Sequence, residues 1–178
     1  IRDSLIYDKD ERLVGFQLKD LIRLVETFGF FLVNLDIREE STKHSNAIHE
    51  IIGALTKEDY LSLNENKRVN CLESLIKSDF NVDSIYMTLS DDTKKVVDVF
   101  LTMVKLRKQI SEEAFGHYII SMTHEASHVL EVLALAKLSG MIKKDKDKGW
   151  ISTIKVSPLF ETIDDLSRIN DILESLLD

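Results

Sequence analysis

The sequence predicts a mainly helical α/β protein with about three short parallel strands and several inserted helices. The chain of 178 residues has only one proline and six glycines, so few residues interrupt its helices. Apolar residues recur three and four apart over most of its length, which is the spacing of one helical face. Three short apolar runs each lead into a polar turn and a helical segment. Strands that alternate with helices in this way are typical of parallel βα units.

The predicted strands are short, and polar residues follow each of them. They are Phe30–Leu35, Tyr118–Met122 and Ile151–Val156. Gly29 directly precedes the first strand and is a typical C-terminal stop for the helix before it. Because a typical domain has ~150 residues, we expect residues 1–178 to form a single domain.

The predicted helices follow the apolar stripes in chain order. They are Phe16–Phe28, one or two helices within residues 43–63, a helix through Val69–Ile76, a long helix capped by Ser90, Val129–Leu138 capped by Ser127, and a last helix from Asp164 to Leu177. We expect a loop within Asp79–Leu89 and a solvated, mobile turn at Lys143–Lys148.

Composition excludes several classes of function. The 31 acidic residues against 23 basic ones give a net charge of −8, which disfavours a nucleic-acid partner. The single cysteine, Cys71, excludes an internal disulfide and suits a reducing compartment, so we expect a cytoplasmic protein. No apolar run approaches the ~18 residues that span a bilayer, so we expect no membrane partner. The largely polar segment Ile1–Asp10 does not read as a signal peptide.

One local motif suggests zinc chemistry. His124-Glu125-Ala126-Ser127-His128 matches the H-E-x-x-H pattern, which on a helix directs two imidazoles at one Zn²⁺. Here the motif follows a predicted strand, and Ser127 fits a helix cap better than the middle of a helix. We therefore expect His124 to lie in the turn before the helix, with the two rings pointing apart.

Two polar residues at the expected carboxyl ends of strands are better functional candidates. Arg38 follows the first predicted strand, and Glu161 follows the third. Parallel α/β sheets bind ligands at that edge, where a guanidinium can hold an anion and a carboxylate can ligate Mg²⁺ or Mn²⁺. Each residue also has a structural explanation, because Arg38 can pair with a nearby acid and Glu161 can cap the next helix.

Three separate stretches, in order along the chain, carry recognisable motifs. They are Leu35-Asp36-Ile37-Arg38-Glu39-Glu40-Ser41, Tyr118-Ile119-Ile120-Ser121-Met122-Thr123, and Pro158-Leu159-Phe160-Glu161-Thr162-Ile163-Asp164-Asp165-Leu166. Together they resemble the phosphoenolpyruvate carboxylase family, whose pattern P-L-F-E-T-x-D-D-L the last stretch matches. The sequence departs from the family at Glu39, usually Gln, and at His128, usually Asp. The second departure creates the H-E-x-x-H pattern.

The resemblance implies a carboxy-lyase that adds bicarbonate to phosphoenolpyruvate with Mg²⁺ or Mn²⁺, giving oxaloacetate and phosphate. It implies that Arg38 contacts the substrate phosphate and that Glu161 ligates the metal. It also implies a βα barrel, of which this chain would hold about the first three units, because a complete barrel needs ~250 residues. The family's catalytic His, its second metal carboxylate and its Gly- and Arg-rich loop have no counterpart here. We therefore expect a central fragment that is inactive alone and binds no cofactor.

Two other functions remain open at this point. One is a zinc hydrolase that uses His124 and His128, and the other is a non-catalytic helical interaction module that keeps the family residues for packing. An incomplete barrel would also leave an unpaired strand edge. Such edges pair with other chains, so we expect a homo-oligomer or helices that cover the edge.

The strand assignments lead to one geometric prediction. If Phe30–Leu35 and Ile151–Val156 are parallel strands of one sheet, Arg38 and Glu161 leave by the same edge and converge. With Tyr118–Met122 between them, the strand ends would lie roughly 10 Å apart at the backbone, within reach of both side chains. We expect both side chains to be accessible to solvent.

Overall fold

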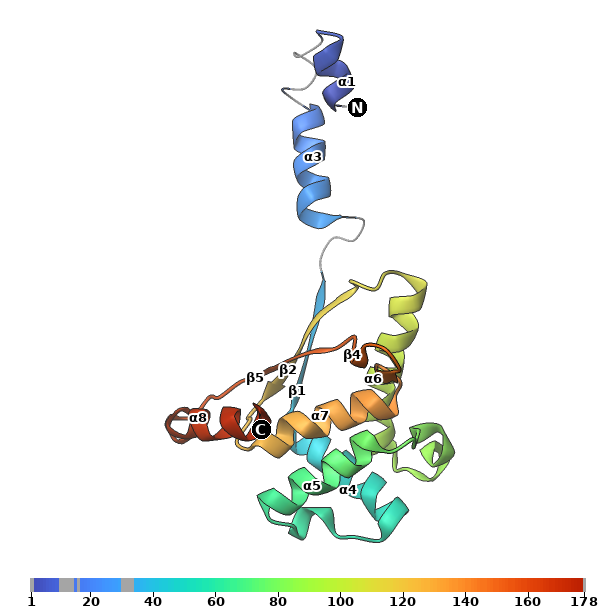
Figure 1. The fold of residues 1–178 in the computed structure, drawn as a ribbon, viewed down its shortest axis with the longest axis vertical. Helices are drawn as coiled ribbons and strands as arrows, with labels where there is room; N and C mark the ends of the chain where they lie inside the picture. Colours follow the sequence, from blue (N-terminus) through green and yellow to red (C-terminus); the bar gives the residue numbers. More distant parts are fainter. Residues whose placement is uncertain (1, 10–14, 16, 30–33, 178) are drawn as a thin grey trace. The chain divides into compact units, whose positions relative to one another are not determined.

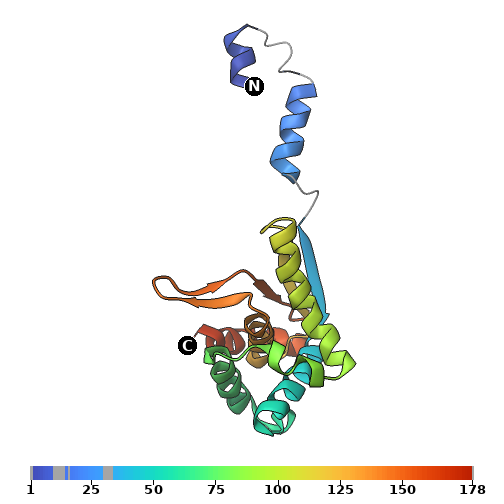
Figure 2. The same cartoon turned by 90° about the vertical axis from the view of Figure 1, so that its right-hand side faces the viewer.

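The computed structural model describes residues 2–9, 15, 17–29 and 34–177, and the chain divides into two compact units (Figures 1 and 2). The first unit is Ile1–Asn34 and the second is Leu35–Asp178. Among the described helices, none is both long enough and apolar enough to cross a membrane. That residues 1–178 form one domain of a larger barrel stays a prediction.

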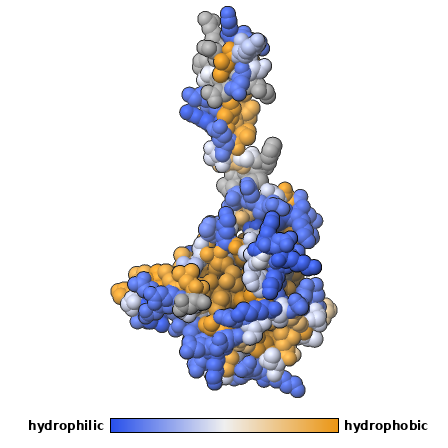
Figure 3. Space-filling model, viewed as in Figure 1, coloured by the Kyte–Doolittle hydropathy of each residue, from blue (hydrophilic) through white to orange (hydrophobic). Residues whose placement is uncertain are grey.

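The first unit contains helices α1 (Arg2–Tyr7) and α3 (Gln17–Phe28). Helix α3 matches the predicted helix and ends at Gly29, whose φ of 57° is the left-handed conformation expected of a C-terminal stop. The amide of Gly29 donates to the carbonyl oxygen of Val25 at 2.8 Å. Four apolar side chains of α3 are exposed and recur at helical spacing: Leu21, Leu24, Val25 and Phe28. Figure 3 shows hydrophobic surface on the first unit.

The second unit is built on a three-stranded parallel sheet with the order β1-β2-β5. Its strands are β1 (Leu35–Glu40), β2 (Phe115–Ser121) and β5 (Lys155–Pro158). The sheet confirms the prediction of a mainly helical α/β protein with three short parallel strands. It also confirms that the strand near Tyr118 lies between the other two.

Two of the strand boundaries were predicted wrongly. Within the predicted strand Phe30–Leu35, residues 30–33 lie outside the described residues, and β1 begins at Leu35. Arg38 is therefore inside the strand rather than beyond its end. The predicted strand Ile151–Val156 is two strands, because Thr153 and Ile154 separate β4 (Gly149–Ser152) from β5.

The charged segment Lys143–Lys148 was predicted as a solvated turn, and this holds only for its exposed second half, residues 146–148, which is the turn of a β-hairpin; Lys143, Lys144 and Asp145 belong to a strand. Strand β3 (Ile142–Asp145) pairs antiparallel with β4. The turn is held by Asp145, whose Oδ1 accepts hydrogen bonds at 2.9 Å from the amides of Asp147 and Lys148. A carboxylate that bonds to amides two residues on is a local turn signal, and the charge run concealed it.

Helices fill the connections between the parallel strands. They are α4 (Ser41–Thr56), α5 (Glu65–Lys77) and α6 (Asp91–Gln109) between β1 and β2, α7 (Ala126–Leu138) after β2, and α8 (Ile163–Leu177) after β5. Three short 3₁₀ turns, η1 (Tyr60–Ser62), η2 (Val82–Ser84) and η3 (Tyr86–Thr88), complete these connections. The loop expected within Asp79–Leu89 contains the last two.

One predicted helix cap is confirmed and one is wrong. The side chain of Ser90 accepts a hydrogen bond from the amide of Thr93 and caps α6, as predicted. Ser127 does not cap α7, which begins one residue earlier at Ala126. Instead, the amide and hydroxyl of Ser127 both donate at 2.7 Å to the carboxylate of Glu65, at the start of α5.

The two faces of the sheet have opposite character. Ile37, Tyr118 and Ile120 face the core that helices α4 to α7 build against the sheet. On the other face, Asp36, Arg38 and His117 are exposed. Successive side chains of a strand alternate between faces, so the core fixes which residues of β1 are presented to solvent.

Candidate functional site

Arg38 and Glu161 meet at the edge of the sheet where its parallel strands end. Nη2 of Arg38 lies 3.1 Å from Oε1 of Glu161, across 123 positions of sequence. The side chains are 60% and 36% exposed, so this ion pair is open to solvent. The prediction that the two side chains converge and remain accessible is confirmed. Their roles toward a phosphate and a metal stay predictions.

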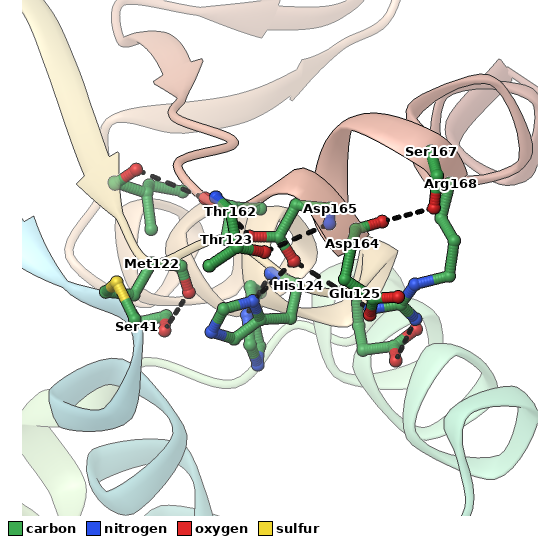
Figure 4. Close-up of polar contacts among 12 residues, drawn as sticks. Ser41, Met122, Thr123, His124, Glu125, Thr162, Asp164, Asp165, Ser167 and Arg168 are labelled. Atoms are coloured by element: carbon green, nitrogen blue, oxygen red, sulfur yellow. Dashed lines mark hydrogen bonds and ion pairs between the residues drawn. The ribbon is translucent and has the colours of Figure 1, made fainter.

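The segments that follow the three strands are tied to one another at this edge. The hydroxyl of Ser41, after β1, donates to the carbonyl oxygen of Met122, after β2, at 2.6 Å. The amide of Thr123 donates to the carbonyl oxygen of Leu159, after β5, at 3.1 Å. The edge is therefore a connected surface made from parts of the chain that are far apart in sequence (Figure 4).

Met122 has an unusual backbone conformation at the centre of this surface. Its φ is 56°, in the left-handed region that residues with a side chain rarely adopt. The bond from Ser41 to its carbonyl oxygen holds the backbone there. This conformation turns the chain sharply out of β2 and directs Thr123 and His124 along the edge toward the segment after β5.

The turn after β5 is closed by a reciprocal capping box at the start of α8. The amide of Thr162 donates to Oδ2 of Asp165, and the amide of Asp165 donates to the hydroxyl oxygen of Thr162, both at 3.1 Å. Oδ1 of the same carboxylate lies 2.6 Å from Nδ1 of His124. Figure 4 shows His124 directed at Asp165 from the segment after β2.

The sequence placed Asp165 near the start of the last helix and within the stretch that matches P-L-F-E-T-x-D-D-L, but indicated no partner for it. The spacing Thr162-Ile163-Asp164-Asp165 is a capping-box pattern and could have indicated the local bonds. Nothing local in the sequence indicates the partner of the carboxylate, because His124 lies 41 positions away.

The H-E-x-x-H residues do not have the arrangement of a helical zinc motif. His124 lies before α7, as predicted. His128 lies within the first turn of α7. The ring centroids are 6.0 Å apart, with 68° between the ring planes. Nδ1 of His128 accepts a hydrogen bond from the amide of His124, while Nδ1 of His124 faces Asp165.

His128 is also poorly suited to carry charge. Burial, and after it the nearby His124, lower the pKa of His128 to about 4. Across the described part of the chain, no group of three or more His, Cys, Asp or Glu side chains is arranged to hold a metal ion. This geometry does not favour the zinc hydrolase.

A second polar cluster lies deep between helices, away from solvent. Glu131 of α7 is fully buried and accepts hydrogen bonds from the hydroxyls of Ser45 and Tyr60, both at 2.8 Å. Desolvation raises the pKa of Glu131 to about 7, although both hydrogen bonds oppose that rise. The hydroxyl of Ser45 also contacts the carbonyl oxygen of Ser41 at 3.3 Å, at the site edge. The sequence did not single out this cluster.

A parallel βα architecture with charged side chains past its strand ends is typical of proteins that bind ligands at the carboxyl edge of the sheet. Comparison with known proteins identifies the family within this class. The model of the phosphoenolpyruvate carboxylase family matches residues 1–178. The chain belongs to that family.

Curated relatives are similar to nearly the whole chain but are much longer. A phosphoenolpyruvate carboxylase of Prochlorococcus marinus subsp. pastoris is 37% identical over 157 residues, covering 88% of this chain and 16% of the relative. That of Thermosynechococcus vestitus is 37% identical over 171 residues, covering 94% and 16%. That of a Synechococcus species is 36% identical over 177 residues, covering 99% and 17%. The chain thus spans about a sixth of the length of these relatives.

Proposed function

We propose that this chain forms the part of a phosphoenolpyruvate carboxylase that holds the substrate phosphate and the metal ion. The observation that carries the proposal is the 3.1 Å contact between Arg38 and Glu161. These residues belong to two stretches that resemble separate family motifs. Because exposed ion pairs contribute only ~0–1 kcal/mol to stability, the contribution of this pair to the fold is small and does not by itself explain why the two side chains meet.

Arg38 has the chemistry to bind the phosphate of phosphoenolpyruvate. Its planar guanidinium presents paired N–H donors that match two oxygens of a phosphate group. The side chain is 60% exposed, so an anion can reach it. In the free chain Glu161 neutralises part of its charge, and we expect a bound phosphate to replace that carboxylate.

Glu161 has the chemistry to ligate a divalent cation. Mg²⁺ and Mn²⁺ prefer oxygen ligands, and Mg²⁺ is commonly held by one or two carboxylates together with substrate phosphate. A single accessible carboxylate beside an anion-binding arginine fits that pattern. A metal ion held there would supply Lewis-acid stabilisation of the negative charge that develops on the substrate.

Other features of the family belong to the same proposal. They are bicarbonate as the second substrate, a cytoplasmic location, a homo-oligomeric state, and a barrel completed by chain beyond this segment. Because the chain spans about a sixth of its relatives, we propose that it lacks part of the catalytic set and is inactive alone. The test is oxaloacetate formation by the purified chain with phosphoenolpyruvate, bicarbonate and Mg²⁺. We expect no product above a Glu161→Ala control.

A hybrid enzyme tests the positive half of the proposal. The matching segment of the Thermosynechococcus vestitus relative is replaced by the corresponding residues of this chain, and carboxylation is measured. We expect activity in the hybrid and its loss in Arg38→Lys and Glu161→Gln variants, with Lys95→Gln, on the exposed surface of α6, as the control. Full activity in both site variants of an active hybrid would refute the proposal.

A further inference from the structure

The β3–β4 hairpin is an exposed arm of the second unit. Its base is anchored by Ile142 and Ile154, which are buried, and every residue from 143 to 153 between them is exposed. Figure 2 shows the hairpin extending away from the helices. Its two strands form a sheet of their own, and a two-stranded hairpin without a further layer is only marginally stable in water. An arm of this kind gains stability when another surface covers it.

The arm carries both positive charge and apolar surface. Four lysines against two aspartates give residues 142–152 a net charge of +2, so the rest of the chain carries −10. Trp150 is 46% exposed and Ile151 is 40% exposed. Nζ of Lys144 lies 5.8 Å from the centroid of the Trp150 ring. Tryptophan is among the residues that contribute most to protein interfaces, so this arm has the composition of a binding surface.

Helix α8 of the same unit has the opposite charge. One face packs inward through Asp165 and Ile172, which are buried. Four large apolar side chains of α8 are exposed: Ile163, Leu166, Leu173 and Leu177. The helical repeat of 3.6 residues places these four along one stripe, with Glu174 beside it and Asp171 and Asp164 next in order around the helix. Figure 3 shows hydrophobic and hydrophilic surface side by side at the position of α8 in Figure 1.

The hairpin and α8 are therefore complementary in charge, and both expose apolar side chains. Both are exposed within a single chain, so neither surface is used up by the fold of one molecule. A second copy supplies both surfaces again. In a dimer with two-fold symmetry the hairpin of each copy meets α8 of the other, and the contact is made twice.

We propose that the β3–β4 hairpin of one copy of this chain binds the acidic, apolar face of α8 on a second copy. Trp150 and Ile151 pack on the exposed leucines of α8, and the lysines of the hairpin pair with the carboxylates beside them. The inference deepens the homo-oligomeric part of the proposed function by naming the two surfaces. It is independent of the phosphate and metal site.

The test measures the association of the 178-residue chain and the environment of Trp150 together. Trp150 is the only tryptophan of the sequence, so its fluorescence reports on the hairpin alone. Analytical ultracentrifugation from 1 to 200 µM should give a monomer–dimer equilibrium at low salt. The Trp150 emission should move to shorter wavelength over the same concentration range, because the ring leaves water. Raising NaCl to about 1 M should weaken the dimer, because salt screens exposed charges.

Charge reversal separates the proposed contact from other modes of association. Lys146→Glu with Lys148→Glu reverses the tip of the hairpin and leaves the contact of Lys144 with Trp150 intact. Asp171→Lys with Glu174→Lys reverses the face of α8. Each reversal should weaken the dimer more than about tenfold, because like charges then meet across the contact. Mixing the two variants, or combining both reversals in one chain, should restore association.

A matched control makes the same change of charge elsewhere. Lys105→Glu with Lys108→Glu alters two exposed lysines of α6 and should leave the association constant unchanged. Circular dichroism checks that every variant keeps the helical content of the unsubstituted chain. All the substitutions lie at exposed positions, so loss of association in a folded variant reports on the contact.

Every outcome counts for or against the contact. A dimer that both reversals weaken and their combination restores supports it. A dimer of unchanged affinity in both reversal variants, or one without a shift of Trp150 emission, overturns the hairpin–α8 contact and leaves the proposed homo-oligomer standing. A chain that remains monomeric at 200 µM contradicts both and assigns the two surfaces to an occupant other than a second copy.

Discussion

Asp165 and Glu131 are both buried carboxyl side chains, and their pKa values move in opposite directions. Asp165, at the start of α8, is 1% exposed, and Glu131, within α7, is fully buried. The pKa of Asp165 falls to about 2, whereas burial raises that of Glu131 to about 7. The comparison shows that the surroundings of each carboxyl group set the direction in which its pKa moves.

Desolvation by burial is the largest cause of the raised pKa of Glu131, whereas hydrogen bonds from Thr162 and His124 are the largest causes of the lowered pKa of Asp165. Glu131 accepts hydrogen bonds from the hydroxyls of Ser45 and Tyr60, which lower its pKa but do not offset the desolvation of its charged form. Asp165 is hydrogen-bonded by Thr162, through its side chain and backbone amide, and by the imidazole of His124, and these bonds favour its charged form. One carboxyl therefore belongs to a nearly neutral core network. Asp165 keeps a negative charge beside His124, near the edge where the parallel strands end.

Removing the Glu131 side chain should give the largest effect on stability. Glu131→Ala leaves the hydroxyls of Tyr60 and Ser45 without a buried partner and opens a cavity, at a cost of about 3–5 kcal/mol. Urea unfolding followed by circular dichroism measures the loss. Glu131→Gln, which keeps the shape and the acceptor oxygen, should cost far less. Equal losses in both variants would show that the hydrogen-bonded network contributes nothing.

The pH dependence of stability should separate the two carboxyls. Because the pKa of Glu131 is about 7 in the fold against 4.5 as its ordinary value, folding favours its protonated form. Its contribution is complete below pH 4.5 and is lost as the pH rises through 7. The free energy of unfolding of Glu131→Gln relative to the unsubstituted chain should therefore rise by about 3 kcal/mol across that range.

Comparing Glu131→Gln with the unsubstituted chain separates the effect of Glu131 from that of two histidines, whose contributions to stability change with pH in the opposite direction. Burial lowers the pKa values of His44 and His128 to about 4, so their contributions are lost as the pH falls. Both histidines are present in the unsubstituted chain and in the variant, and their effects cancel in the comparison. A difference that stays constant between pH 4 and 8 would contradict the elevated pKa of Glu131.

Removing one hydrogen-bond donor of the buried network should lower the stability by less than removing Glu131. Tyr60→Phe removes the hydroxyl that donates to Oε1 of Glu131 and retains the ring against which the Arg68 guanidinium lies. The expected loss of stability is about 1–2 kcal/mol, as for one hydrogen bond to a buried group. Chemical unfolding at pH 8 should show a larger loss than at pH 5, because the ionised carboxyl depends more on its donors.

The contribution of Asp165 to the free energy of unfolding should change with pH in the direction opposite to that of Glu131. It should also be the smallest of these effects. Its contribution is present above its ordinary pKa of 3.8 and is lost as the pH falls toward 2. The stability difference between the unsubstituted chain and Asp165→Asn should therefore shrink as the pH falls from about 4 to about 2. Urea unfolding at a series of acidic pH values measures it. A difference that grows as the pH falls would contradict the assignment of a charged Asp165.

The sequence was sufficient to predict the parts of the site that lie beside strand ends. Arg38 and Glu161 occur in short motifs, and the parallel arrangement of their strands brought them to one edge as expected. The predictions failed where distant residues replaced local partners. Ser127 is a suitable helix cap by type, but Glu65 of α5 takes both of its donors, so it does not cap α7.

Other features depend on burial that no local pattern reveals. Glu131 interrupts an apolar run and is typical of an exposed residue, yet the hydroxyls of Ser45 and Tyr60 allow it to be buried.

The extent of β1 was also missed. Its exposed residues Asp36, Arg38 and Glu40 alternate with partly buried ones along one half-exposed strand. That pattern indicates a strand with one open face rather than a polar turn.

The central claim is that Arg38 binds the substrate phosphate and Glu161 binds the metal ion at one site. The most direct measurement is the kinetics of the hybrid carboxylase as phosphoenolpyruvate and Mg²⁺ are varied separately. Arg38→Lys should raise the KM for phosphoenolpyruvate at saturating Mg²⁺. Glu161→Gln should raise the Mg²⁺ concentration needed for half-maximal rate. Unchanged dependence on both ligands in both variants would contradict the account.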